Sequence, residues 1–157
     1  MGDKLHHYHT DLTWIGHGEK VSSFKRHNRS YVLSIEGKPP IPGSSDPGFR
    51  GDSSRWNPED LLLAALSSCH HLFFMYLCGQ AGIEVQRYED HADGTMEENP
   101  DGSGQFTQVT LRPKVRLAPG SDVKKAEEIH HVSHEKCFIA RSVTFPVRHE
   151  PVFEIGE

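Results

Sequence analysis

The chain has few cysteines, and their number argues against a fold built on disulfides. Among its 157 residues are three cysteines, an odd number with no Cys-x-x-Cys pair, whereas secreted disulfide frameworks use an even number of cysteines. No apolar stretch follows the N-terminal residues, so no secretory signal peptide is predicted. These absences favour a cytoplasmic protein with reduced thiols.

A strong excess of one charge is also missing. The 17 basic and 22 acidic side chains leave a formal net charge of −5, which gives no general electrostatic reason to bind nucleic acid or an anionic membrane. No internal repeat or low-complexity segment is present. The length suits one globular domain with a hydrophobic core. We therefore expect a single domain over residues 1–157, with no nucleic-acid or membrane partner.

The longest apolar stretch lies mid-chain and predicts a helix over residues 57–78. Asn57 is a favourable N-cap, and Pro58 fits the first helical position. Glu59 adds negative charge at the positive end of the helix dipole. The segment is about long enough to span a membrane, but its charged and polar residues argue against a span. Apolar side chains on nearly every face instead indicate a helix buried all round, with a glycine ending it.

Strand-like segments lie on both sides of this helix. They occupy residues 5–14, 30–35, 83–85 with 88–96, 106–117, and 142–147 with 152–153. Residues 36–48 are rich in Pro, Gly and Ser and predict a long loop leading to the helix. Asp122 caps a second predicted helix that ends near His134. The pattern predicts an α+β fold, with antiparallel sheets around a long buried central helix.

The cysteines differ in their expected environments. Cys69 lies in the middle of the central helix, where a thiol is either packed or reactive. Cys78 lies about 180° away from Cys69 on the same helix, so we expect it in the core. Cys137 follows the second helix, and nothing in the spacing shows whether it meets Cys69.

Two motifs resemble those of the OsmC and organic hydroperoxide resistance (Ohr) family. Residues 57–69 read Asn-Pro-Glu, then an Ala-rich apolar run, then Cys69, as in the central helix of that family. Residues 137–143 are similar to the segment that carries its second cysteine. The order of strands and helices fits the family across nearly the whole chain.

The resemblance implies an intertwined homodimer that reduces organic hydroperoxides without a cofactor. In that scheme Cys69 is the peroxidatic thiol and Cys137 the resolving thiol. Attack on the O–O bond makes a sulfenic acid on Cys69, and Cys137 converts it to a Cys69–Cys137 disulfide. A dithiol or thiol reductant then restores the protein.

The family also supplies an arginine beside the peroxidatic cysteine, held by a glutamate that corresponds here to Glu59. A cation of this kind favours the thiolate. This sequence departs from the pattern, because the early glycine turn at residues 16–20 has no arginine. Arg50 is the preferred candidate, although its alignment needs a gap of one residue, and Arg55 is the alternative.

Helix geometry separates Glu59 from Cys69. Ten residues of helix span about 15 Å, so the two side chains cannot share one site within a single chain. An antiparallel crossing of two copies near residues 64–65 would bring Glu59 of one copy towards Cys69 of the other. The sequence therefore predicts composite sites and an inactive monomer.

Two rival interpretations remain open at this point. His130, His134 and Cys137 have i, i+4 and i+7 spacing in a chain with 12 histidines, which suits a zinc site and a metal-binding or interaction protein. The other rival is an OsmC-like protein that has kept the fold without peroxidase activity. The ambiguous arginine gives that interpretation weight.

Overall fold

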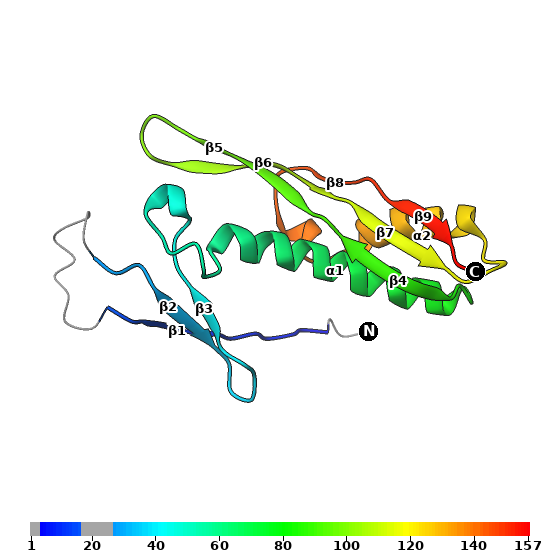
Figure 1. The fold of residues 1–157 in the computed structure, drawn as a ribbon, viewed down its shortest axis with the longest axis horizontal. Coiled ribbons are helices and arrows are strands. Elements are labelled where there is room, and N and C mark those ends of the chain that lie inside the picture. The colour runs from blue at the N-terminus through cyan, green and yellow to red at the C-terminus, as the bar shows by residue number, and fades with distance from the viewer. Residues whose placement is uncertain (1–3, 17–26) are drawn as a thin grey trace. The chain divides into compact units, whose positions relative to one another are not determined.

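The structure is a computed structural model that describes residues 4–16 and 27–157. The chain divides into two compact units, Met1–Leu61 and Leu62–Glu157, and Figure 1 labels the elements of both. The single domain expected over residues 1–157 stays a prediction. Of the early glycine turn at residues 16–20, only Gly16 lies within the described residues.

The described part of the first unit holds a small antiparallel sheet. Its elements are β1 (Asp11–Trp14), β2 (Tyr31–Ser34), β3 (Ile41–Gly43) and a short 3-10 helix, η1 (Pro47–Phe49). The loop predicted over residues 36–48 therefore contains a strand and a helical turn. A Cβ on Gly43 would clash with the ring of Tyr31, its partner on β2, so glycine at this position leaves room for the ring.

Helix α1 (Pro58–Gln80) begins with a reciprocal cap. Asn57 Oδ1 accepts a hydrogen bond from the Asp60 amide at 2.7 Å, and Asp60 Oδ2 accepts one from the Asn57 amide at 3.3 Å. This arrangement satisfies two amides that have no partner within the helix. The predicted N-cap and the position of Pro58 are confirmed.

The same helix ends at a glycine in the left-handed conformation. Gly82 has a φ of +68°, and its amide donates to Gly79 O at 3.3 Å while the Ile83 amide donates to Cys78 O at 2.9 Å. These two bonds form a Schellman motif, which satisfies the last carbonyls of the helix. The helix therefore runs through Gly79 and stops before Gly82, two residues later than the predicted end at residue 78.

The second unit contains two mixed sheets and a second helix. Its elements are β4 (Val85–Asp90), β5 (Asp93–Glu98), β6 (Gly104–Leu111), β7 (Pro113–Leu117), α2 (Val123–Lys136), η2 (Ala140–Ser142), β8 (Val147–His149) and β9 (Val152–Ile155). The strand orders are β4-β7-β9 and β5-β6-β8.

The prediction of antiparallel sheets is wrong for two strand pairs. β6–β8 and β7–β9 are parallel, whereas β4–β7 and β5–β6 are antiparallel. Parallel pairing needs a crossover connection, and the segment containing α2 lies in both such connections, from β6 to β8 and from β7 to β9. The long strand predicted over residues 106–117 is also divided at Arg112. Pro113 begins β7, where its missing amide hydrogen costs little.

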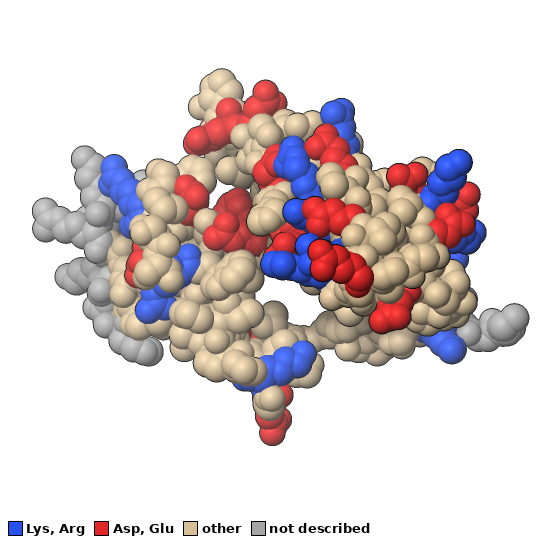
Figure 2. All heavy atoms as spheres, turned by 45° about the vertical axis from the view of Figure 1, so that its right-hand side comes forward, with Lys and Arg blue, Asp and Glu red and all other residues tan. Residues whose placement is uncertain are grey.

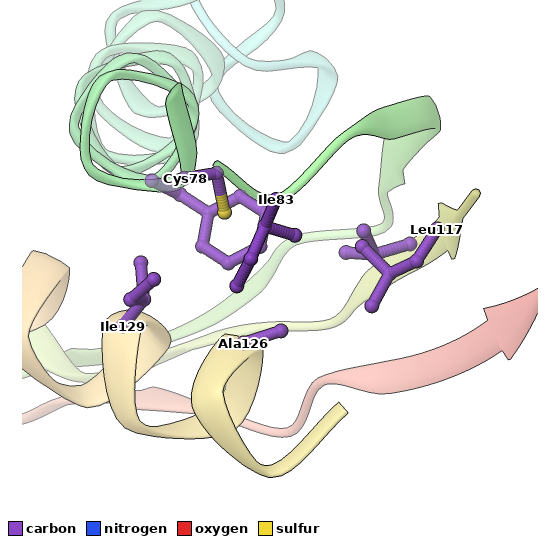
Figure 3. Packing of buried hydrophobic residues seen from close by; sticks show 7 residues of the cluster. Cys78, Ile83, Leu117, Ala126 and Ile129 are labelled. Atoms are coloured by element: carbon purple, nitrogen blue, oxygen red, sulfur yellow. The ribbon is translucent and has the colours of Figure 1, made fainter. Parts of the chain in front are cut away.

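The core of the second unit lies between α1, α2 and the sheets. One cluster joins Phe74 and Cys78 of α1 to residues of β7 and α2, and Figure 3 shows Cys78, Ile83, Leu117, Ala126 and Ile129 pointing towards one another. A second cluster is built on Leu66 with Val109, Leu111 and Val147. Ala126 and Ile129 are the buried apolar residues that α2 contributes to the first cluster.

The central helix is not buried all round within the chain. Leu66, His70, Phe74 and Cys78 form its buried stripe, whereas Leu72 and Tyr76 are 66% and 61% exposed. By length and composition alone, α1 could cross a membrane: an 18-residue window has a mean hydropathy of 1.6, with 22% of that window buried. Core helices of soluble proteins can have the same length and apolar composition. One chain covers one side of α1 and leaves apolar residues of the other side open.

Charged side chains are interleaved by sign on the face that Figure 2 shows. Over the β4-β7-β9 sheet, Glu154 pairs with Lys114 at 2.8 Å and with Arg116 at 3.4 Å. Such exposed pairs contribute little to stability. They do neutralise one another, so this surface offers no field of one sign to a charged partner.

The cap of α2 gives a direct test of this local structure. Asp122 Oδ1 accepts a hydrogen bond from the Lys125 amide at 3.0 Å. Asp122→Ala should lower the free energy of unfolding by about 1 kcal/mol, because a helix amide loses its partner. Glu127→Ala, on the exposed surface of the same helix, removes the same charge and serves as the control. Urea unfolding that gives equal midpoints for the two variants would contradict the capping role.

Candidate functional site

The structure brings Cys69 and Cys137 together. Cys69 is half-buried on α1, and Cys137 is the C-cap of α2, where it is 1% exposed. Burial first, and then a hydrogen bond with the Cys69 thiol, raise the pKa of Cys137 to about 11. Both thiols are free. Two cysteines that lie far apart in the sequence thus form one thiol pair within the second unit.

The backbone around Cys137 explains its position. α2 ends there, because Cys137 adopts an extended conformation with φ −63° and ψ 114°. Its amide donates to His134 O at 3.3 Å, and the Ala140 amide donates to Cys137 Sγ at 3.5 Å. The amide on the sulfur acts against the effect of burial and lowers the pKa of the thiol. A turn of backbone therefore fixes the sulfur and offers it a hydrogen-bond donor.

An aromatic pair joins the two segments that carry Cys69 and Cys137. Phe73 lies four residues after Cys69 on α1, and Phe138 directly follows Cys137. Their rings meet edge to face with centroids 5.1 Å apart and an interplanar angle of 89°. Phe138 is 69% exposed. The two segments that carry the sulfurs thus also meet through an aromatic contact, which no motif in the sequence indicated.

Cys78 occupies the core, as predicted. It is 1% exposed and packs in the cluster of α1 and α2. Burial raises the pKa of this thiol to about 11. No other titratable group contributes to that shift, so Cys78 has the properties of an inert packing residue.

The other predicted site residues lie in the first unit. Glu59 is half-buried, and its Oε2 atom is buried without a hydrogen-bond partner among the described residues. Burial of Tyr31 first, and then the negative charge of Glu59, raise the pKa of Tyr31. Arg55 pairs with Asp52 at 3.4 Å. Arg50 is the C-cap of η1, in the left-handed conformation with a φ of 63°.

The unpartnered carboxylate oxygen of Glu59 is a group that a guanidinium would satisfy. The assignment of Arg50, or of Arg55 as its alternative, to Cys69 stays a prediction, as does the role of Glu59. Along α1, Glu59 and Cys69 are separated by about 15 Å of helix.

The zinc site of the rival interpretation does not form in the part of the chain that the structure describes. Among residues 4–16 and 27–157, no group of three His, Cys, Asp or Glu side chains is arranged to hold a metal ion. The i, i+4, i+7 spacing of His130, His134 and Cys137 requires a continuous helix, but α2 ends at Lys136. Cys137 therefore turns away to Cys69, and the histidines pack elsewhere.

The histidines instead form a buried cluster between α1, α2 and β8. His70 Nε2 and His130 Nδ1 are 2.6 Å apart, and the His149 ring lies 5.8 Å from the His70 ring and 5.7 Å from the His130 ring. Burial is the main cause that lowers the pKa of both His70 and His130 to about 3, and neighbouring histidines add to it. These rings are therefore neutral at pH 7. The spacing in the sequence indicated His130 on α2 but not its partners His70 and His149.

The environments of the three cysteines predict their order of alkylation. In the native protein at pH 8, iodoacetamide should modify half-buried Cys69 first, and buried Cys78 and Cys137 at least about tenfold more slowly, because both carry pKa values raised to about 11. Their modification should still accelerate above pH 9. Peptide mapping by mass spectrometry measures the three rates, and the urea-unfolded protein, in which all three should react alike, is the control. Faster labelling of Cys137 than of Cys69 would contradict this arrangement.

Comparison with known proteins identifies the family. Residues 51–151 match the family described as OsmC-like protein. The solved structure of an OsmC-like protein of unknown function from Vibrio cholerae is 29% identical with a TM-score of 0.85, over 94% of this chain and 100% of that one. The uncharacterized protein YmaD of Bacillus subtilis is 22% identical, over 88% of this chain and 87% of YmaD.

A more distant structure shares the fold. An organic hydroperoxide resistance protein from Elizabethkingia anophelis has a TM-score of 0.67 at 16% identity, over 96% of this chain and 99% of that protein. The family match over residues 51–151 covers well over half of the 157 residues and contains both Cys69 and Cys137. The chain belongs to the OsmC-like protein family.

Proposed function

We propose that this protein is a thiol peroxidase that reduces organic hydroperoxides. The observation that carries the proposal is the pairing of the Cys69 and Cys137 thiols between α1 and the end of α2. The proposal is supported by family membership, and some solved structures that share the fold are named organic hydroperoxide resistance proteins.

The chemistry balances with these two thiols. The Cys69 thiolate attacks one peroxide oxygen and breaks the O–O bond, so the sulfur is oxidised to a sulfenic acid and the alkoxide leaves as an alcohol after taking a proton. The Cys137 sulfur then attacks the Cys69 sulfur and displaces hydroxide, forming the disulfide. An external dithiol or thiol reductant supplies two electrons to restore both thiols.

The protonation state of Cys137 suits the resolving role. With its pKa raised to about 11, this thiol keeps its proton at neutral pH until the sulfenic acid forms beside it. The same proton then converts the departing hydroxide into water. A thiol held neutral also competes poorly for the peroxide, because the thiolate is the nucleophile. Cys137 becomes a nucleophile only as it passes its proton to the oxygen of the adjacent sulfenic acid. Cys69 is therefore the thiol that attacks the peroxide.

The attacking thiolate still needs a cation, and we assign it to a second copy of the chain. Glu59 has a buried carboxylate oxygen without a partner among the described residues, and it lies about 15 Å along α1 from its own Cys69. The exposed apolar Leu72 and Tyr76 of α1 give a second copy a surface to cover. Glu59 of that copy would hold Arg50, or Arg55 in the alternative assignment, beside Cys69.

Cysteine substitutions test the two thiol roles. Cys69→Ser should abolish consumption of an alkyl hydroperoxide from the first turnover. Cys137→Ser should consume about one equivalent and stop with Cys69 as a sulfenic acid, which over-oxidises in excess peroxide. Cys78→Ser, a buried thiol outside the pair, is the matched control and should turn over normally. Single-turnover assays with a sulfenic-acid trap distinguish the variants, and turnover by Cys69→Ser would overturn the mechanism.

Mixed dimers test the composite site. Glu59→Gln should lower the peroxidase rate by at least about tenfold, while loss of a first-turn charge should cost only about 0.3–1 kcal/mol of stability. A co-expressed heterodimer of Cys69→Ser and Glu59→Gln chains contains one site with both native residues. It should recover about half of the wild-type rate, although each parent homodimer is nearly inactive. No recovery in a heterodimer verified by mass spectrometry would contradict sharing of the site between copies.

A further inference from the structure

Two buried imidazoles join α1 to α2. His70 on α1 is 1% exposed and His130 on α2 is 0% exposed. Their facing nitrogens are 2.6 Å apart, and the rings are stacked, with an interplanar angle of 26° and centroids 4.5 Å apart. One ring therefore donates its N–H to the lone pair of the other. We refer to His70 and His130 as the imidazole pair.

Among residues 4–16 and 27–157, no acidic side chain near the imidazole pair is placed to neutralise a positive charge on it. Phe74 lies 4.5 Å from the His130 ring, and Phe153 of β9 lies 5.8 Å from it. The titratable or charged groups near the pair come from each neighbouring element: His71 on α1, His131, His134 and Glu135 on α2, His149 on β8, and Tyr88 with Asp90 on β4. Of these, His71, His134 and His149 act on the pair as like charges.

The carboxylates in this group are engaged elsewhere. Glu135 pairs with exposed His131 at 3.4 Å, and Asp90 accepts hydrogen bonds from Ser67 Oγ and from the Arg112 amide. The other ring nitrogens of the imidazole pair, His70 Nδ1 and His130 Nε2, are buried without a partner among the described residues. An added proton on the pair therefore finds neither an acceptor for its hydrogen bond nor a counter-charge.

The 2.6 Å contact limits how many protons the imidazole pair can hold. A first extra proton goes to an unpartnered outer nitrogen and places a charge in an apolar site. A second must go to the nitrogen that accepts the hydrogen bond. Two N–H groups would then face each other across 2.6 Å, and two like charges would lie side by side. The doubly protonated pair has to separate.

We propose that the imidazole pair is an acid-sensitive latch that holds α2 against α1 at neutral pH and releases it as the pH falls. The latch is independent of peroxidase chemistry. It has a consequence for the thiol pair, because α2 ends at Cys137 and α1 carries Cys69. Release of α2 would carry Cys137 away from Cys69, and acid would thus separate the two sulfurs without any change in the sulfurs themselves.

The direction of the pH effect follows from linkage. Burial lowers the pKa of His70 and of His130 to about 3 in the closed state, whereas an exposed histidine has a pKa of about 6.5. Between these values the open state binds more protons than the closed state. The closed state is therefore fully favoured above about pH 6.5 and loses stability as the pH falls towards 3.

Hydrogen exchange of the reduced protein, in buffer with EDTA, measures the release. After correction for the intrinsic exchange rate, amide protection of α2 (Val123–Lys136) should fall between pH 7 and pH 5. The expected fall is roughly 25-fold for one histidine that titrates only when open, and roughly 600-fold for two. Amides of β6 and β7 should keep most of their protection, because the latch joins only α1 and α2.

Two histidine variants sharpen the test. Gln at position 130 still forms a hydrogen bond but does not titrate, so His130→Gln should reduce the fall in α2 protection by roughly 25-fold. His91→Gln removes an exposed histidine of the same unit and should behave as wild type. If His130→Gln fails to fold, the wild-type profile still decides, because a latch requires a fall of at least roughly 25-fold.

Three outcomes would overturn the latch. They are constant α2 protection down to pH 5, equal pH profiles for wild type and His130→Gln, and an equal loss of protection in α2, β6 and β7, which would indicate global unfolding. None of these depends on peroxide turnover. A protein without peroxidase activity can still show the latch, and an active peroxidase can lack it.

Discussion

The structure of the second unit depends on one stripe of α1. Leu66, His70, Phe74 and Cys78 recur every four residues and are all buried. Leu66 belongs to one hydrophobic cluster, and Phe74 and Cys78 belong to the other. Burial of each large apolar side chain contributes about 1.5–3 kcal/mol, so this stripe fixes the rotation of the helix about its axis. Cys69 precedes a buried position, and its place beside Cys137 follows from that rotation.

The thiol pair combines a rigid partner with an adjustable one. Cys69 lies in the middle of a 23-residue helix that is capped at its start by Asn57 and closed at its end by Gly82. Cys137 lies at a chain turn, where an extended residue and the 3-10 helix η2 set the sulfur position. Disulfide formation in the proposed cycle requires the two sulfurs to approach bonding distance, and turns absorb such shifts more readily than helices.

Local signals in the sequence predicted local structure well. Asn57 and Asp122 are side-chain caps whose hydrogen bonds span three residues, and such short-range chemistry is visible in the sequence itself. The parallel pairs β6–β8 and β7–β9 were not predicted, because the sequence of a strand does not indicate which distant strand it pairs with. The same reason explains the histidine cluster. His130 suggested a metal site through its neighbours on α2, while its actual partner, His70, lies on another helix.

The two sides of α1 have different surroundings within the chain. On the buried side, His70 bonds to His130, and nearby Ser67 donates to Asp90 at 2.5 Å. Such specific polar contacts between elements of one chain are typical of a protein core. On the other side, Leu72 and Tyr76 are exposed within the chain. Burial in the proposed homodimer would account for those residues and would place the Glu59 end of one helix near the Cys69 region of the other. The composition that allows a membrane span is thus also what a helix shared by two copies requires.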